Sequence, residues 1–455
     1  DRSPSRGLGD VYKRQLHDHV NAEVAGGAIR SKQDAVDWLT WTFLYRRLRH
    51  NPAYYRLDDG SVPCVSDFLS GLVESVLTDL EAAGCVALAP DGLGVEPLPL
   101  GQVASLYYLQ HSTVARFHAQ LGARRGEDAD GWNAPARHDV PSLLAVLCDA
   151  AEFAELPVRH NEDELNGALA LECPLPVDSA SLDAPHVKAH LLLQAHFSRL
   201  PLPITDYVTD TKGVLDQALR VLQAMVDIAA DAGSLPNALG AMSLCQAVCQ
   251  AAWPGSAQLE TLPHMSHDAA AAIGAKGGGR CAFLAHVAEM SDAELHALLA
   301  PHVPERERRD VLRAIRSFPL VDVTPLLPRL RSSAGGNGSH GGARSAQADE
   351  PGAELHLAAD AEGTLAVELA RVNRPPERKV YAPRFPKPKG EGWWLVCADG
   401  DELLALKRVS VGRATRVELR LVAPAEPGEY VFTVYLVSDC YIGFDQQRDV
   451  RVVVT

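Results

Sequence analysis

The segment Val187–Gly233 reads VKAHLLLQAHFSRLPLPITDYVTDTKGVLDQALRVLQAMVDIAADAG. It predicts two apolar helices on either side of a proline-containing corner. In the second helix, apolar residues recur at three- and four-residue steps, which is typical of one buried face: Leu215, Ala218, Leu222, Met225, Val226 and Ala229. Polar residues recur at the same steps on the opposite face: Asp216, Arg220, Gln223, Asp227 and Asp231. This polar face is either an ordinary solvated surface or the lining of a channel.

The length and charge of the chain restrict its class. At 455 residues the chain is too long for one typical core, so we expect three or four domains. Lys and Arg number 43 against 58 Asp and Glu, which gives a net charge of −15. This balance argues against a protein that binds nucleic acid with its whole surface, but it leaves room for a local groove with a few arginines.

The nine cysteines are scattered without a CxxC pair, which is typical of reduced intracellular thiols and not of a disulfide framework or a zinc site. No run of about 18 apolar residues predicts a membrane span. Residues 1–15 are basic and polar, lack an apolar signal core, and stay an unassigned leader. We therefore expect a soluble nuclear and cytosolic protein without a membrane partner. Because the sequence opens without a methionine, we expect a fragment.

Residues 16–97 have the order of a winged helix, with helices followed by a small hairpin. We expect a helix to follow an N-cap at Ser31 and to end at Asn51, and a second amphipathic helix over Ser66–Gly84. Winged helices bind DNA in some proteins and act as packing modules in others. Three arginines lie near the expected helix end at Asn51: Arg46, Arg47 and Arg49. We expect their charges to stabilise the C-terminus of the helix, and the alternative is contact with phosphate.

Residues 98–254 are predicted to form a helical bundle, and residues 255–331 a small module of short helices with capping serines at Ser266 and Ser291. Arg159 to Asp163 is read as a charged helix start that holds neighbouring helices together. The spacing around His160 does not match a zinc motif, so a metal site is not expected. The glycine-rich GAKGGGR is read as a flexible turn, with phosphate binding as the alternative.

Residues 332–353 have the composition of a flexible linker, and the pattern changes after them. Over 354–455 apolar residues alternate with period two, and turn signals separate about seven short strands. This pattern favours an antiparallel β-sandwich. Ala382 to Lys389, APRFPKPK, is predicted to be an extended arm that enters this region.

Catalytic motifs are missing from the sequence. It contains no GxxxxGK[ST] phosphate loop, no GxSxG elbow and no HExxH. We therefore predict no catalytic residue and no metal site, and we expect a helical scaffold followed by a β-sandwich.

Several stretches resemble the large Ski-like and Brr-type DExH-box helicases. KQDAVDWLTWTFLYRRLRHNPAYY is similar to the winged helix that follows their motor domains. Five further stretches resemble their Sec-sixty-three-type unit: LPLGQVASLYYL, PVRHNEDELN, KAHLLLQAHFSRLPLP, DYVTDTKGVLDQALRVLQAMVDIAA and APRFPKPKGEGWW. SDCYIGFDQQ resembles the closing strand pair of that unit, so the resemblance covers nearly all of Leu16 to Thr455.

The resemblance implies a multidomain, mainly α fold with a winged helix, a helical bundle, a helix-loop-helix and a C-terminal immunoglobulin-like β-sandwich. One bundle helix, the ratchet helix, corresponds to residues 209–233 and lies across the nucleic-acid channel under the motor domains. The resemblance places Arg220 on the phosphate backbone and Gln223 and Asp227 on sugar or base edges, while Lys212 adds charge. The alternative is that Asp216 and Arg220 form an ordinary exposed ion pair.

The resemblance also implies a part in ATP-dependent 3′-to-5′ unwinding, in DNA repair or ribosome quality control. ATP and Mg²⁺ are expected only in the motor domains, which this sequence lacks, so the chain alone is expected to hold no cofactor and to be inactive. Its expected partners are single-stranded DNA or RNA, bound weakly, the motor domains of the same polypeptide, and other subunits of a multiprotein complex. The alternative function is a scaffold that docks partner subunits, as in the second cassette of the spliceosomal helicase.

Overall fold

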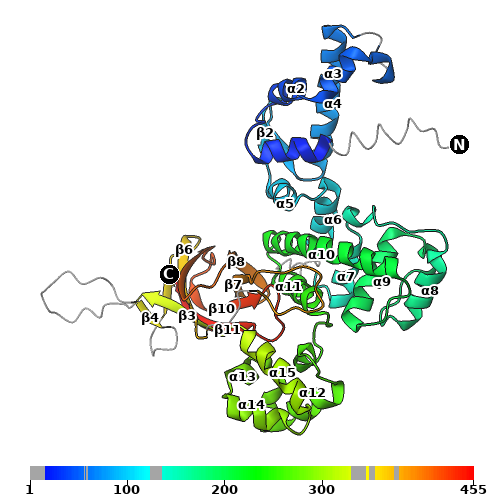
Figure 1. Ribbon diagram of the computed structural model, residues 1–455. Coiled ribbons are helices and arrows are strands. Elements are labelled where there is room, and N and C mark those ends of the chain that lie inside the picture. Colours follow the sequence, from blue (N-terminus) through cyan, green and yellow to red (C-terminus); the bar gives the residue numbers. More distant parts are fainter. Residues whose placement is uncertain are drawn as a thin grey trace, which may run out of the picture. The chain divides into compact units, whose positions relative to one another are not determined.

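The computed structural model describes residues 16–55, 57, 60–122, 136–328, 345–347, 354–373 and 379–455. The chain divides into two compact units (Figure 1). The first takes its described residues from Asp1–Ala136, Ala145–Glu155 and Gln223–Ala232. The second takes them from Arg137–Leu144, Leu156–Leu222 and Gly233–Thr455. The predicted leader lies outside the described residues. None of the described helices is long and apolar enough to cross a membrane.

The first unit begins with helical residues 16–25 and continues through short helices and one hairpin. Its further elements are α2 (Lys32–Thr40), α3 (Phe43–His50), η1 (Pro52–Tyr55), α4 (Val62–Ala82), β1 (Val86–Leu88), β2 (Val95–Pro97), α5 (Pro99–Tyr107), α6 (His111–Leu121) and η2 (Ala151–Phe153). The predicted hairpin is confirmed, since β1 and β2 pair antiparallel. Helix α7 (Val140–Cys148) contributes residues to both units.

The prediction of one helix from Ser31 to Asn51 is wrong, because the chain forms two helices there. The cap at Ser31 is confirmed, since its side chain accepts a hydrogen bond from Asp34 N at 3.1 Å. At Thr42, however, the backbone leaves the helical region, with φ −85° and ψ 162°, and the hydroxyl donates to Leu39 O at 2.6 Å. This local side-chain bond competes with the helix and ends α2.

The second unit contains a set of longer helices and a set of short ones. The helices are α8 (Glu162–Glu172), η3 (Ser179–Ser181), α9 (Pro185–Ser198), α10 (Thr205–Asp231), α11 (Leu235–Gln250), η4 (Gln258–Thr261), α12 (His267–Gly274), η5 (Lys276–Ala282), α13 (Leu284–Glu289), α14 (Asp292–Leu299) and α15 (Glu305–Ser317). The last residues of α10 belong to the first unit. The serine caps predicted at Ser266 and Ser291 are confirmed, and Ser291 forms a complete capping box with Glu294.

Helix α10 is longer at its start than predicted, since it begins at Thr205 and not at residue 209. Its predicted apolar face is confirmed, because all six residues of that stripe are buried. The helix ends at Asp231, and Gly233 follows with φ 73°, a left-handed conformation that favours glycine.

The β-rich region forms two sheets. The strands are β3 (Val321–Pro328), β4 (Ser345–Gln347), β5 (Leu355–Leu357), β6 (Glu362–Arg371), β7 (Trp393–Asp399), β8 (Glu402–Val409), β9 (Ala414–Val422), β10 (Gly428–Ser438) and β11 (Gln446–Val454). One sheet has the order β5-β11-β10-β7-β8 and the other β4-β3-β6-β9. Pairing is antiparallel except for β5 with β11, which is parallel.

Two strands lie outside the region in which strands were predicted. Strand β3 falls in the segment assigned to the helix-loop-helix module, and it pairs with β6. Strand β4 falls in the segment assigned to the linker, and the rest of that segment lies outside the described residues. The β-rich region therefore starts at Val321 and not after a linker.

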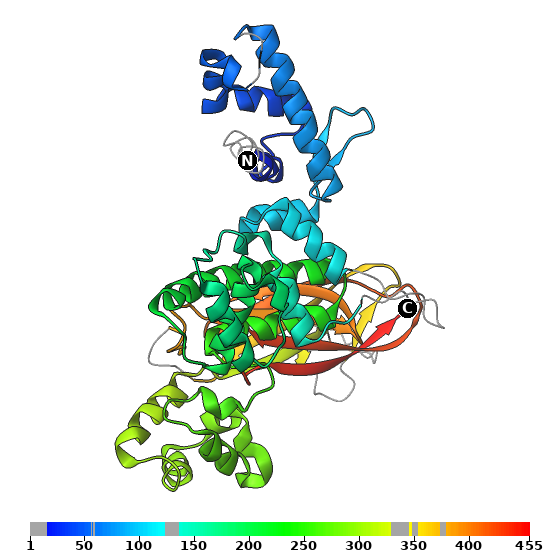
Figure 2. The ribbon, with the colours of Figure 1, turned by 90° about the vertical axis from the view of Figure 1, so that its right-hand side faces the viewer.

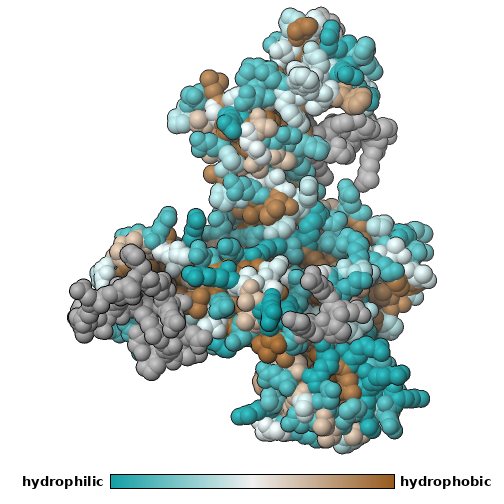
Figure 3. Space-filling model, turned by 60° about the vertical axis from the view of Figure 1, so that its left-hand side comes forward, coloured by the Kyte–Doolittle hydropathy of each residue, from teal (hydrophilic) through white to brown (hydrophobic). Residues whose placement is uncertain are grey.

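Figure 2 shows the short helices as a group below the sheets. One cluster of buried residues nevertheless runs from these helices into both sheets. Strand burial alternates as predicted in β9, where every second residue from Val417 to Leu421 is buried. In β7 the predicted alternation is wrong, because every residue from Trp393 to Ala398 is buried and both faces of this strand are covered. The same core includes Ile273 of α12 and Ile315 of α15. On the face drawn in Figure 3, hydrophilic residues predominate and hydrophobic ones form small separate groups. The buried core is thus continuous between the short helices α12–α15 and the β-rich region.

Candidate nucleic-acid interface on helix α10

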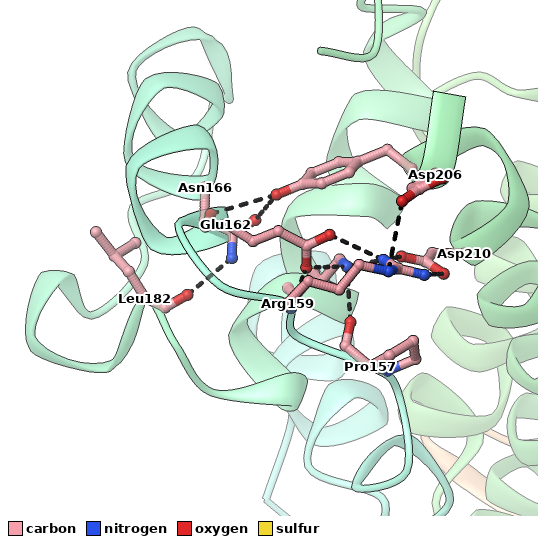
Figure 4. A network of polar contacts seen from close by, with 9 residues as sticks. Pro157, Arg159, Glu162, Asn166, Leu182, Asp206 and Asp210 are labelled. Carbon is pink, nitrogen blue, oxygen red and sulfur yellow. Dashed lines mark hydrogen bonds and ion pairs between the residues drawn. The ribbon is translucent and has the colours of Figure 1, made fainter. Parts of the chain in front are cut away.

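The first turns of α10 are fixed by a largely buried network of four charged side chains (Figure 4). Lys188 of α9 has no exposed side-chain surface, and its Nζ lies 2.6 Å from Glu162 Oε2 and 2.7 Å from Asp210 Oδ2. It also donates to Pro157 O at 2.8 Å. Arg159 Nη1 lies 2.8 Å from Glu162 Oε1 and 2.7 Å from Asp210 Oδ2. We call these four side chains, Arg159, Glu162, Lys188 and Asp210, the charge cluster.

The charge cluster keeps its two acids ionised. Burial alone would raise the pKa of Glu162 and of Asp210, but hydrogen bonds from Lys188 and Arg159 outweigh burial and hold both pKa values below the ordinary range. Tyr207 of α10 closes one side, with its ring centroid 4.6 Å from Lys188 Nζ. The cluster therefore joins the first turns of α8, α9 and α10.

The predicted role of Arg159 and Glu162 in holding helices together is confirmed. Their partners, Lys188 and Asp210, were not predicted from the sequence. A signal was present, because Lys188 is the only charged residue in the apolar run VKAHLLLQAHF. His160 is exposed. In the described part of the chain, no group of three or more His, Cys, Asp or Glu side chains is arranged to hold a metal ion.

The corner between α10 and α11 is held by the β-rich region. Leu403 N donates to Gly233 O at 2.9 Å, and Leu235 N donates to Asp401 O at 3.1 Å. Ser234, between them, is buried and forms an isolated antiparallel bridge with Glu402. The turn between β7 and β8 thus holds the residues Gly233 to Leu235 that lead into α11.

Helix α11 continues this attachment through two buried glutamines. Gln246 Nε2 donates to Ser438 O at 2.9 Å and contacts both carboxylate oxygens of Asp445, at 3.0 and 2.9 Å. Gln250 Nε2 donates to Cys440 O at 2.7 Å. These acceptors lie in the stretch SDCYIGFDQQ, so this stretch connects the β-rich region to α11.

The four predicted contact residues of α10 lie in different surroundings. Lys212 is exposed, whereas Arg220, Gln223 and Asp227 are half-buried. Arg220 Nη2 donates to Gln217 Oε1 of the same helix. Asp227 Oδ2 accepts a hydrogen bond from Tyr107 OH at 2.6 Å, which ties α5 to α10 within the first unit. Asp227 therefore has a structural partner, and its contact with sugar or base edges stays a prediction.

Asp216 has a partner that the sequence did not predict. Its Oδ1 lies 2.7 Å from Lys387 Nζ of the proline-rich arm. In the second unit, α10 thus presents Lys212, Asp216 and Arg220 at steps of four residues, which places successive positions about 6 Å apart along the helix. The two cations of this set, Lys212 and Arg220, therefore lie about 12 Å apart on one helix face. Cations on one face of a helix can contact phosphates of a nucleic-acid strand.

Comparisons with known proteins cover nearly the whole chain. The family described as Sec63 Brl domain matches residues 97–451, and the family described as Winged Helix-turn-helix domain matches residues 10–90. Activating signal cointegrator 1 complex subunit 3 of Bos taurus is 40% identical over 463 residues, with 97% of this chain and 20% of the relative covered.

Two further relatives carry helicase names. DExH-box ATP-dependent RNA helicase DExH14 of Arabidopsis thaliana is 39% identical, with 96% of this chain and 18% of the relative covered. U5 small nuclear ribonucleoprotein 200 kDa helicase of Homo sapiens is 35% identical, with 95% of this chain and 18% of the relative covered. The chain spans about a fifth of the length of these relatives. The predicted resemblance to large DExH-box helicases is confirmed, and the chain belongs to the Sec63 Brl domain family.

Proposed function

We propose that this chain is the strand-guiding part of an ATP-dependent 3′-to-5′ nucleic-acid helicase. The observation that carries the proposal is the outward face of α10, with Lys212 exposed and Arg220 half-buried, in a chain whose relatives are named helicases. Arg220 and Lys212 contact the phosphate backbone, and Gln223 and Asp227 contact sugar or base edges. ATP hydrolysis is left to motor domains outside this sequence.

The fixed position of α10 supports this role. The charge cluster holds its first turns, and the turn between β7 and β8 holds the corner that follows it. A helix held in this way can keep its side chains in place while a strand moves along it, because positioning on rigid elements keeps contact geometry constant.

A salt titration tests the proposal. Fluorescent single-stranded RNA and DNA are titrated with the chain at several salt concentrations, beside Arg220→Glu and a matched control, Arg420→Glu, at an exposed position of β9. We expect the native chain to bind less tightly as the salt concentration rises. R220E should bind less tightly than the native chain, and its salt slope, the slope of log K against log salt concentration, should be smaller in size by about 1 or more. Equal affinity of R220E and R420E at every salt concentration would refute the assignment.

A second candidate function is a scaffold that docks partner subunits. Two relatives bear names of complexes, a cointegrator complex subunit and a small nuclear ribonucleoprotein. On the strands, Val422 and Val431 are 56% and 55% exposed, as apolar contact residues of a docking surface would be. The test is binding of purified subunits of that cointegrator complex to the chain and to Val422→Asp and Val431→Asp. Unchanged binding would refute docking at these strands.

The finer assignments stay proposals as well. They are an immunoglobulin-like topology of the β-rich region, domain bounds at residues 97 and 254, a role in DNA repair or ribosome quality control, and a nuclear and cytosolic location. The two-sheet arrangement and the shared core support the first of these.

A further inference from the structure

The proline-rich arm, Ala382–Lys389, was predicted to be extended, and this prediction is wrong. The segment forms a loop with a turn at Pro383 and Arg384, and both ends of the loop are anchored. At its entry, Tyr381 N donates to Tyr441 OH at 3.2 Å, and Phe385 is 9% exposed. At its exit, Lys389 forms an ion pair with Asp439, and both side chains are 14% exposed. Val380 N also donates to Lys389 O at 3.0 Å, which joins the two ends. The backbone between these anchors has little freedom to move.

Lys387 lies between the anchors and reaches away from them. Its side chain is 62% exposed, and its Nζ lies 2.7 Å from Asp216 Oδ1 of α10. Pro386 and Pro388 flank it, and each fixes its own φ near −65°. The direction of this lysine is therefore set by the anchored backbone, and the β-rich region delivers a cation to the outward face of α10.

The pair with Lys387 changes the charge pattern of that face. Without it, α10 would present a cation, an anion and a cation at Lys212, Asp216 and Arg220. An exposed carboxylate between two phosphate-binding cations would repel the strand. An exposed ion pair adds little to stability, so stability does not explain an arm built to place Lys387 there.

We propose that Lys387 is a positioning residue of the nucleic-acid interface, which masks Asp216 so that the strand meets no net negative charge between Lys212 and Arg220. The ligand is the phosphate backbone of a single strand, in RNA or DNA. This inference rests on the proposed function of α10 and adds a residue from the β-rich region to it.

The charge pattern makes a specific prediction for two single variants and their combination. Lys387→Ala removes a cation and also unmasks Asp216, so it lowers affinity for the strand. Asp216→Asn removes the anion that repels the strand, so it raises affinity. In the D216N background, Lys387→Ala loses less affinity than in the native background, because only the cation is lost.

The experiment measures binding of the whole chain to fluorescent oligouridine and oligothymidine of about 20 nucleotides, a length that exceeds one binding site. Lys387→Ala is compared with Lys407→Ala, an exposed lysine of β8 with the same change of charge. We expect K387A to weaken binding roughly 3- to 10-fold and to reduce the size of the salt slope by about 1. The affinity and the salt slope of K407A should stay near those of the native chain. The thermal midpoint confirms that each variant is folded.

The outcomes separate this inference from the proposed function. If R220E loses affinity while K387A equals K407A, the masking role is wrong and the α10 interface stands. If K387A has the same effect in the native and the D216N backgrounds, Lys387 acts as a plain cation and masking is again wrong. If the native chain binds neither strand at low salt, or R220E and K387A are both without effect, both proposals fall.

Discussion

Lys188 Nζ lies 2.6 Å from Glu162 Oε2, and no part of the Lys188 side chain is exposed. Charged groups at such depth are retained only with partners, because an unpaired buried charge is very costly. Lys188→Met would leave Glu162 and Asp210 facing each other with Arg159 as their remaining cation. We expect the variant to lose about 3–5 kcal/mol in its free energy of unfolding, measured by urea denaturation.

The matched control for this prediction is Lys387→Met, the same replacement in an exposed ion pair. Because exposed pairs contribute little, we expect this variant to lose less than about 1 kcal/mol. Similar losses in both variants would show that the charge cluster is not the reason for the effect at Lys188.

Tyr107 and Asp227 provide a second test, within the first unit. The hydroxyl of Tyr107 donates to Asp227 Oδ2 at 2.6 Å, and Tyr107 is 7% exposed. A hydrogen bond to a charged group contributes about 1.5–3 kcal/mol, so we expect Tyr107→Phe to lose a similar amount of unfolding free energy. In a double-mutant cycle with Asp227→Asn, the loss in the double variant should be smaller than the sum of the two single losses. Fully additive losses would mean that the two side chains are not coupled.

Much of this site follows from the sequence, and part of it does not. The helical period of α10 alone predicts which of its faces is buried, and Ser31, Ser266 and Ser291 predict where three helices begin. These features depend on residues close together in the chain. Sequence patterns predict such features well, because the interactions that produce them lie within about one turn of a helix.

The partners of the site residues depend on long-range packing. Lys387 and Asp216 meet only because the arm is anchored on Tyr441 and Asp439, far away in the sequence. Strand β3 was missed for the same reason. Its sequence VDVTPLLP contains Pro325, which reads as a turn residue, and the strand forms through pairing with β6. Strand formation depends on such partners more than on local preference.

Asp445 predicts a pH dependence of stability. Burial raises its pKa to about 6, although Gln246 and Ser438 N donate hydrogen bonds to it. The folded state therefore holds the proton more tightly than the unfolded chain, whose carboxyl titrates near 3.8. The stability gained from this proton is fully present below about pH 3.8 and is lost as the pH rises through about 6.

Asp445→Asn isolates this effect, because the amide never ionises and keeps an oxygen acceptor. Between about pH 4 and pH 7, we expect the unfolding free energy of the native chain to fall relative to D445N by about 3 kcal/mol. Urea denaturation of both proteins across this range measures the difference. A difference that stays constant with pH would mean that Asp445 is ionised throughout.

Gly101 marks a close approach between α5 and the hairpin in the first unit. A Cβ at this position would lie 2.1 Å from Cys85 O and 2.7 Å from Asn21 Oδ1, while Asn21 Nδ2 donates to Gly101 O at 2.9 Å. The backbone oxygen of Cys85 cannot move away without disturbing Leu98, whose N donates to it at 3.0 Å. We therefore expect Gly101→Ala to lose at least about 1–3 kcal/mol, the usual cost of overpacking.

Gly71 is the matched control, because it lies in α4, is exposed, and a Cβ there would meet nothing within 4 Å. Alanine is favoured over glycine inside a helix, so we expect Gly71→Ala to gain about 0.5–1 kcal/mol. The same chemical change should thus have opposite signs at two positions of one unit, which thermal midpoints can resolve. If Gly101→Ala instead gained stability as Gly71→Ala does, the backbone contact between α5 and Cys85 would have to be absent in solution, and the attachment of α5 to the hairpin would need another explanation.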